Sequence, residues 1–179
     1  MHDKISTPTG TPVPDKNVNE ISSRESFEGG YGDEYDREEL SRIVKYNTRT
    51  RTWQQDWGRL FQGRASHGCT FVDGKVIVAG GYRIEDDIYL RSTEIVDVDS
   101  RQTRPASNMV VSRNGAALVN ANGRVLAIGG ITDDKNPKSL KSVEEFDLER
   151  ETWSLAPFSL DQHRSSMSYL VVPEHKICP

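Results

Sequence analysis

Two stretches of this chain repeat each other without an insertion or deletion, and this repeat constrains the fold more than any other feature. Residues 64–81 read RASHGCTFVDGKVIVAGG, and residues 113–130 read RNGAALVNANGRVLAIGG. Each copy opens on an arginine and ends on a double glycine, and the copies are 49 residues apart. The chain is therefore expected to be an array of similar structural units.

Within each copy, two apolar strands flank a turn dipeptide. Asp73-Gly74 and Asn122-Gly123 accept positive φ at both central positions of a type I′ turn, which is the turn of tight β-hairpins. Repeats of roughly 40–50 residues occur in β-propeller blades and in helical solenoids, but pairs of helices would not carry these turns. The repeat therefore favours propeller blades.

The double glycine that ends each copy resembles that of kelch repeats. The family's later aromatic residue and tryptophan also match after the second copy, and the same spacing occurs upstream of the first. In the first copy, Arg104 stands where the tryptophan is expected. The residues that carry the resemblance, and that we expect to be structural, are Gly29, Gly30, Gly80, Gly81, Gly129, Gly130, Tyr46, Trp53, Phe146 and Trp153.

The resemblance implies an all-β fold: kelch-type blades of four antiparallel strands in an incomplete, open β-propeller. We expect strands at 68–72, 75–79, 93–98 and 102–104, and again at 116–120, 124–128, 143–148 and 152–155. Residues 1–38 are polar and contain the stretch STPTGTPVPD, so we expect a largely disordered arm. The kelch region is expected at 39–178, as a partial blade 39–56, blades 64–107 and 113–156, and a partial blade 164–178.

Composition excludes several classes of protein. The net charge of −4 argues against a broad nucleic-acid surface. The sequence contains no run of 18 apolar residues and no signal-peptide pattern at its start, so we expect a cytoplasmic protein that does not bind membranes. Cys69 and Cys178 do not form a disulfide framework, which fits that location.

Catalytic patterns are missing from the sequence. The four histidines show neither zinc-ligand spacing nor a CxxC neighbour, and no GxSxG nucleophile motif occurs. Kelch-type folds also include copper oxidases resembling galactose oxidase, but Cys69 has no neighbouring tyrosine. We therefore expect no enzyme activity, no metal and no cofactor, and keep a propeller enzyme as the less favoured alternative.

The long connections of such blades would all emerge on one face, because antiparallel strands alternate in direction. They are residues 32–42, 82–91 and 131–141 between the second and third strands, and 54–63, 105–112 and 156–163 between blades. Binding residues tend to lie on long loops carried by a rigid scaffold. The candidate partner-binding residues are Arg64, Arg113, Arg164, Trp57, Tyr82, Glu85, Asp86, Asp87, Tyr89, Asp133 and Asp134.

Each group of candidates has a structural alternative. The three arginines open successive strands on the loop face and could hold an acidic partner segment by bidentate bonding, or could bridge loop carbonyls between blades. In the first case they lie at strand entrances and not in the core. The acidic clusters could steer a basic partner, or could form an ordinary solvated surface.

These observations indicate a non-catalytic module that binds another protein. The resemblance implies two contexts: the substrate-recognition part of a cullin-type ubiquitin-ligase adaptor, whose partner is a degradation substrate, or a protein associated with actin and the cytoskeleton. Three blades are fewer than the four that propellers typically require, so we also expect the chain to self-associate.

Overall fold

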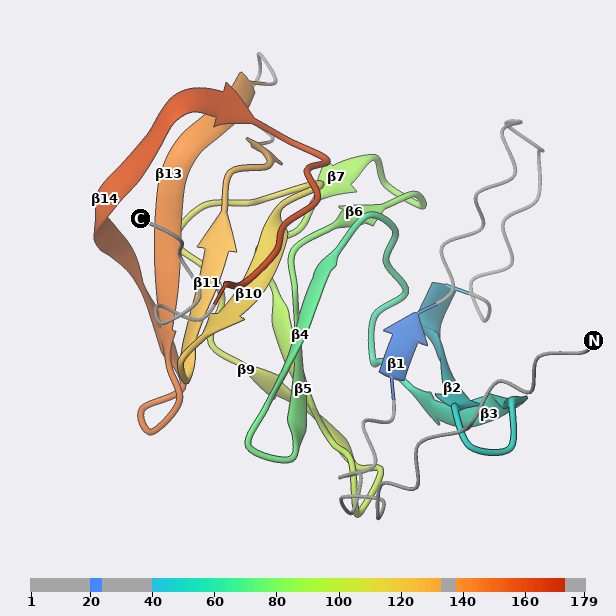
Figure 1. Cartoon of the computed structure of the whole chain (residues 1–179). Coiled ribbons are helices and arrows are strands. Elements are labelled where there is room, and N and C mark those ends of the chain that lie inside the picture. The colour runs from blue at the N-terminus through green and yellow to red at the C-terminus, as the bar shows by residue number, and fades with distance from the viewer. Residues whose placement is uncertain (1–19, 24–39, 133–137, 173–179) are drawn as a thin grey trace, which may run out of the picture.

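A computed structural model of the chain describes residues 20–23, 40–132 and 138–172, and for 20–23 only the backbone (Figure 1). The strands are β1 (Glu20–Ser23), β2 (Arg42–Asn47), β3 (Thr52–Arg59), β4 (Gly68–Val72), β5 (Lys75–Ala79), β6 (Tyr82–Arg83), β7 (Ile88–Tyr89), β8 (Thr93–Asp97), β9 (Thr103–Ala106), β10 (Ala117–Ala121), β11 (Arg124–Ile128), β12 (Ile131–Thr132), β13 (Lys138–Asp147) and β14 (Thr152–Arg164).

The first repeat folds into a four-stranded antiparallel sheet, which we call blade one. Its strand order is β4-β5-β8-β9, so the four strands follow their order along the chain, with β6 and β7 in the connection between β5 and β8. The β4–β5 turn has φ of 48° at Asp73 and 75° at Gly74. Both angles are positive, as a type I′ turn requires, and the predicted hairpin is confirmed.

The second repeat forms blade two, in which β10, β11, β13 and β14 follow one another across the sheet and the short β12 adds to β13. Its two outer strands are longer than predicted. β13 begins at Lys138, and it pairs with β14 as far as Leu140 opposite Arg164. Residues 156–163, expected as a loop, are therefore strand, because the extended β13 offers them a pairing edge.

The upstream sheet, here the N-terminal sheet, has the order β1-β2-β3. Its strands β2 and β3 match the expected half blade, although β3 continues to Arg59 through the segment predicted as a loop. β1 lies within the N-terminal arm predicted to be largely disordered and pairs with β2. The rest of that arm lies outside the described residues, as do Gly29 and Gly30, so their roles stay predictions.

The expected first strand of a further blade, from Arg164 onward, is not formed as such. Arg164 ends β14, and residues 165–172 belong to no strand. Their backbone still bonds to the start of the second repeat, since the Ser166 N–H donates to the Gly115 carbonyl at 2.8 Å. Residues 173–178 lie outside the described residues. Within the described residues, no sheet closes into a ring.

The double glycines allow successive units to approach each other closely. Gly80 has a φ of 69°, and a Cβ atom there would lie 2.3 Å from the Arg113 carbonyl oxygen. Gly129 repeats this arrangement against Arg164, with 2.4 Å to its carbonyl oxygen. A side chain at either position would collide with the backbone where the next unit starts, so glycine is required there.

Two hydrophobic clusters lie between the three sheets. Blades one and two enclose a cluster that contains Ile77, Met109, Phe146 and Trp153. The Trp153 indole N–H donates to the Thr93 hydroxyl of blade one at 2.9 Å. The ring of Trp153 also packs on Phe146, with centroids 4.9 Å apart. The tryptophan of blade two thus fills the space between these blades.

The cluster between the N-terminal sheet and blade one is filled differently. Thr103, and not Arg104 as we expected, lies opposite Val96 in the register that places Trp153 opposite Phe146. Neither Val96 nor Thr103 is large enough to fill the space between the N-terminal sheet and blade one. Trp57 of β3 fills it instead, with only 2% of its surface exposed. The tryptophan in this space therefore comes from the preceding sheet, because the following blade has none at the position that matches Trp153.

Candidate functional site

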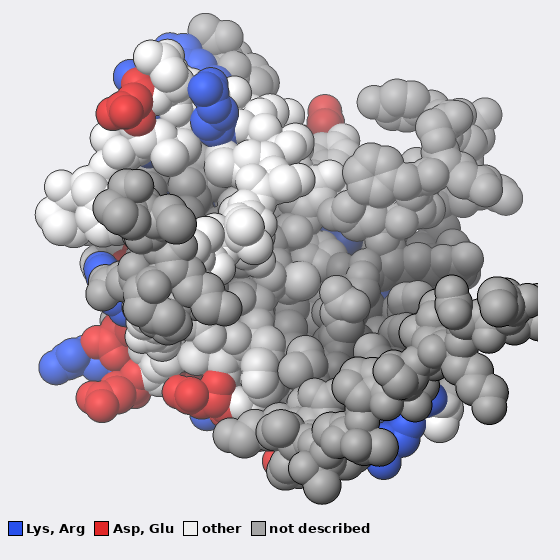
Figure 2. Space-filling view, viewed as in Figure 1, with Lys and Arg blue, Asp and Glu red and all other residues white. Residues whose placement is uncertain are grey.

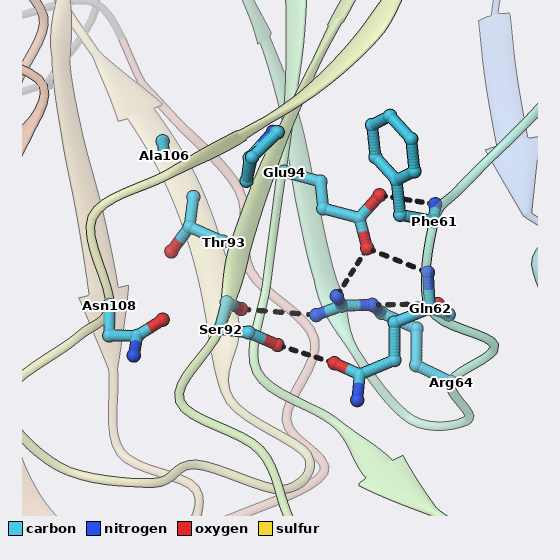
Figure 3. A pocket seen from close by; sticks show the side chains of 9 residues that line it. Phe61, Gln62, Arg64, Ser92, Thr93, Glu94, Ala106 and Asn108 are labelled. Atoms are coloured by element: carbon cyan, nitrogen blue, oxygen red, sulfur yellow. Dashed lines mark hydrogen bonds and ion pairs between the residues drawn. The ribbon is translucent and has the colours of Figure 1, made fainter.

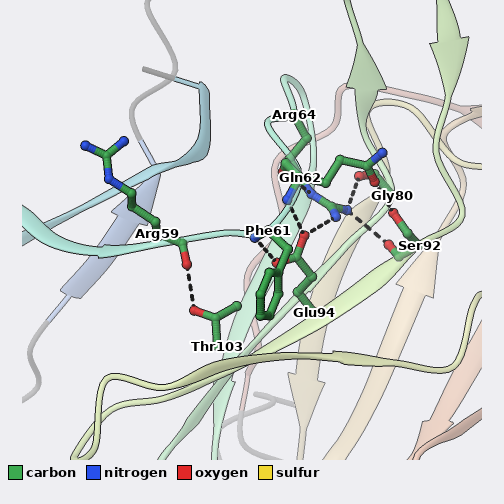
Figure 4. Close-up of polar contacts among 8 residues, drawn as sticks. All are labelled: Arg59, Phe61, Gln62, Arg64, Gly80, Ser92, Glu94 and Thr103. Atoms are coloured by element: carbon green, nitrogen blue, oxygen red, sulfur yellow. Dashed lines mark hydrogen bonds and ion pairs between the residues drawn. The ribbon is translucent and has the colours of Figure 1, made fainter. Parts of the chain in front are cut away.

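A buried ion pair fixes the start of blade one (Figure 4). The Arg64 guanidinium donates to a carboxylate oxygen of Glu94 on β8 at 2.6 Å, and to the carbonyls of Gly80 and Ser92 at 3.0 Å each. Glu94 also accepts the backbone N–H groups of Phe61 and Gln62, at 2.7 and 3.2 Å. The pair therefore ties the loop that enters the blade to two of its inner strands.

Blade two contains the corresponding ion pair, with different neighbours. The Arg113 Nε donates to Glu144 on β13 at 3.0 Å, and its Nη1 donates to the carbonyls of Gly129 and Ser142 at 2.7 and 2.9 Å. Glu144 accepts the N–H groups of Val110 and Val111 at 2.6 and 3.1 Å. We call these two arrangements the Arg–Glu ties.

The Arg–Glu ties are part of the core. Arg64 is 2% exposed and Arg113 is 0% exposed. Burial lowers the pKa of both guanidinium groups, while the paired glutamates act in the opposite direction. Because arginine keeps its charge at physiological pH, each tie is a buried charge pair whose bonding groups are used internally.

This geometry corrects one hypothesis about the loop face. We expected Arg64 and Arg113 at strand entrances, available to an acidic partner segment. Both guanidinium groups are instead buried and bonded to a glutamate and to main-chain carbonyls, so their donors are already used inside the protein. The structural alternative, in which the arginine bridges loop carbonyls between neighbouring blades, matches in part: each arginine bonds carbonyls, but those of its own blade, together with a carboxylate that we did not assign.

Arg164 occupies the third position of the series and differs from the other two. Its carbonyl accepts the Gly130 N–H at 2.8 Å, just as the Arg113 carbonyl accepts the Gly81 N–H at 2.8 Å. Its side chain is exposed and donates to the neighbouring His163 carbonyl at 3.1 Å. The backbone therefore continues the repeat, whereas the guanidinium remains on the surface.

The connection between β5 and β8 forms a small hairpin, β6–β7, on the loop face. The rings of Tyr82 and Tyr89 pack edge to face across it, with centroids 5.7 Å apart. The Tyr82 hydroxyl donates to Asp87 at 2.7 Å. The Arg83 guanidinium donates to both carboxylate oxygens of Asp86. The hydrogen bond from Arg83 lowers the pKa of Asp86.

The acidic cluster on this hairpin is therefore partly neutralised from within, since Asp86 and Asp87 bond to Arg83 and Tyr82 of the same hairpin. Glu85 is exposed beside them. Elsewhere on the surface, acidic and basic side chains are also mixed, as Figure 2 shows for the end of blade two near the β13–β14 turn. Asp133 and Asp134 lie outside the described residues, so a shared acidic rim stays a prediction.

Trp57 and Trp53 have the reverse of their expected environments. We expected Trp57 on an exposed loop, where it could anchor a partner. That was wrong, because β3 extends through residue 57 and turns this side chain into the core. Trp53, expected to pack between blades, is 55% exposed, although its ring lies 4.8 Å from that of Tyr46.

Comparison with known proteins identifies the repeat. A family model described as the Kelch motif matches residues 112–157, which contain β10 to β13, the start of β14 and the Arg113–Glu144 pair. The chain therefore contains a match to a kelch repeat at these residues. Blade one shares the strand order, the double glycine and the Arg–Glu tie of the matched kelch repeat.

A curated relative supports the same family. The chain is 32% identical over 114 residues to the Kelch repeat and BTB domain-containing protein 8 of Xenopus tropicalis. The aligned region covers 54% of this chain and 18% of the relative. The chain thus spans only a small part of the kelch protein that it matches.

Sequence reasoning missed the role of Glu94 and Glu144, although a signal was present. Each glutamate lies 30 or 31 residues after its arginine and occupies the second position of a predicted strand. Arginine and glutamate recur at matching positions of both repeats, and a glutamate that lies in a buried strand needs a partner. That pairing could have been inferred before the structure was known.

Among the described residues, no three or more His, Cys, Asp or Glu side chains gather in a way that could hold a metal ion. In the same residues, no helix has the length and apolar character needed to cross a bilayer.

Proposed function

We propose that this kelch-repeat chain is a non-catalytic module that binds another protein through its loop face. Kelch repeats suggest an interaction module, and the described connections 60–67, 82–91 and 107–116 lie at the end of the blades that carries β6–β7, the upper end in Figure 1. The tight β4–β5 and β10–β11 turns lie at the other end, which we call the turn face.

The observation that carries this proposal is the way in which the Arg–Glu ties hold the loops. In each blade, a buried carboxylate accepts two consecutive N–H groups of the connection that enters the blade. The loop backbone is thereby fixed before any partner arrives. Binding to a preorganised surface loses less conformational entropy, which favours recognition.

We further propose that the partner is recognised as a degradation substrate of a ubiquitin-ligase adaptor. The relative's name joins kelch repeats to a BTB domain, and a recognition module fits the non-catalytic surface described above. A cytoskeletal partner is the alternative. Cytoplasmic location and self-association stay predictions, and the exposed ring of Trp53 is a place where a second copy could pack.

Site-specific photo-cross-linking tests the proposed face. The cross-linker p-benzoylphenylalanine replaces Glu85 or Arg91, which are exposed on the loop face, or Asp99 or Glu149, which are exposed on the turn face. We expect one protein to be captured from both loop-face positions and from neither turn-face position. Capture from the turn face alone, or equally from both faces, would contradict the proposal.

A further inference from the structure

Blade one has a cavity on its loop face (Figure 3). Its volume is about 330 Å³, within the range of roughly 300–1,000 Å³ typical of ligand pockets. The walls come from the loop that precedes β4, the start of β8 and the end of β9. They include Phe61, Gln62, Thr93, Pro105, Ala106 and Asn108.

The charged groups that border the cavity are already bonded to the protein. Arg64 and Glu94 bond each other at 2.6 Å and use their other atoms on main-chain groups. The Gln62 side-chain oxygen accepts the Ser92 hydroxyl at 2.8 Å. A charged occupant would lose its hydration and find no opposite charge available, so the cavity selects an uncharged group.

The cavity also offers an uncovered apolar surface. Phe61 is 73% exposed and lies across the cavity from Ala106 (Figure 3), and Pro105 also lines the cavity. Burying aromatic surface of this kind is favourable at about 25 cal/mol per Å². Asn108 is exposed at the rim, where its amide can bond the main chain of an extended segment.

Blade two differs at the corresponding place. Val110 is the counterpart of Phe61, because each donates its backbone N–H to the glutamate of its tie. In blade one, however, the outer strand β9 ends at Ala106, opposite Thr93. In blade two, β14 continues to Arg164 and pairs with Ser142 and Leu140 of β13. The cavity of blade one therefore depends on the early end of its outer strand.

We propose that this cavity receives one uncharged, apolar side chain of the partner protein. Phe61 and Pro105 form its apolar walls, and the Asn108 amide bonds the main chain beside the inserted residue. The inference rests on the proposed function, since it names the chemistry by which the loop face would recognise a partner.

The test uses small probes, so it does not depend on knowing the partner. N-acetyl-leucinamide and N-acetyl-phenylalaninamide are titrated into the full-length ¹⁵N-labelled chain, with N-acetyl-lysinamide as the charged probe. We expect saturable shifts of the Phe61, Ala106 and Asn108 amide signals with the two apolar probes. Equal shifts with the charged probe, or no saturable shift, would overturn the proposal.

Three variants locate the binding. Phe61→Ser removes one wall and Ala106→Leu fills the cavity, so each should weaken apolar-probe binding at least tenfold. Val110→Ser makes the same kind of change at the counterpart position and should leave binding unchanged. Because Phe61 and Val110 are tied through their backbone N–H groups, both serine variants retain the bonds of the ties. Unchanged binding in the first two variants, or an equal loss in Val110→Ser, would refute the assignment.

The outcome is separate from that of the cross-linking experiment. If loop-face cross-links form but apolar probes do not bind, the pocket assignment fails and the proposed function stands. If the probes bind while cross-links form only from the turn face, the proposed function fails, and with it the assignment of this cavity to a partner's side chain.

Discussion

Glu144 and Glu145 are neighbours on β13, and their replacement by alanine should have very different effects. Glu144 is fully buried in the tie with Arg113, whereas Glu145 pairs on the surface with Arg124, whose side chain is 54% exposed. Both pairs join an arginine to a glutamate. The comparison therefore isolates the effect of burial.

The expected magnitudes follow from the contacts. Glu144→Ala leaves the Arg113 charge buried and removes the acceptor of two N–H groups, from Val110 and Val111. Removing one partner of a buried pair costs about 3–5 kcal/mol. Glu145→Ala removes an exposed pair, which contributes at most about 1 kcal/mol.

Urea unfolding followed by tryptophan fluorescence measures both losses as free energies of unfolding. The double variant Arg113→Met, Glu144→Leu should lose less than the sum of its single variants, because it leaves no unpaired buried charge. If Glu144→Ala lies within about 1 kcal/mol of Glu145→Ala, the argument that the tie is a structural element would be refuted.

Two further predictions concern stability. Trp57→Ala should reduce the free energy of unfolding by about 3–5 kcal/mol, because it leaves a cavity in the cluster against blade one. Trp53→Ala removes a largely exposed ring and should reduce it by about 1–2 kcal/mol. Thermal unfolding of both variants measures the difference. Burial lowers the pKa of His67 from 6.5 to about 4, with Arg64 acting in the same direction. The unfolded state therefore takes up the proton first, and as pH falls from about 6.5 to about 4 the chain should lose about 3 kcal/mol that it holds at neutral pH. Urea titrations across this range should show the loss in the parent chain and a flatter profile in His67→Gln; equal profiles would contradict it.

The blades could be predicted from the sequence because their signals are local. Asp73-Gly74 determines a turn without help from distant residues, and the strands predicted beside it, 68–72 and 75–79, have the bounds of β4 and β5. The lengths of β3 and β14 could not be predicted in this way. Whether a polar segment such as 156–163 pairs depends on how far the neighbouring strand extends, which is a property of the sheet.

The environments of individual side chains were also beyond the sequence. Arg64 looks like a surface residue until Glu94 is known to lie beside it, because burial of a charge depends on a partner 30 residues away. Trp57 follows two glutamines and an aspartate, which suggests a loop. Its burial results from the small residues Val96 and Thr103 on the facing blade, a relation between two units and not within one.

The tryptophan that fills each junction comes from the preceding sheet in one case and from the following blade in the other. The repeats of this chain are therefore not interchangeable. The space before blade one is filled from the preceding sheet by Trp57, and the space before blade two is filled from the following blade by Trp153. A copy of blade two inserted directly after the N-terminal sheet would bring both indoles into one space. A copy of blade one inserted after blade two would bring neither Trp57 nor Trp153 to the new junction. Recombination or duplication of whole repeats would thus require a compensating change at the junction, so the unit that evolves or can be engineered is a pair of facing surfaces and not a blade.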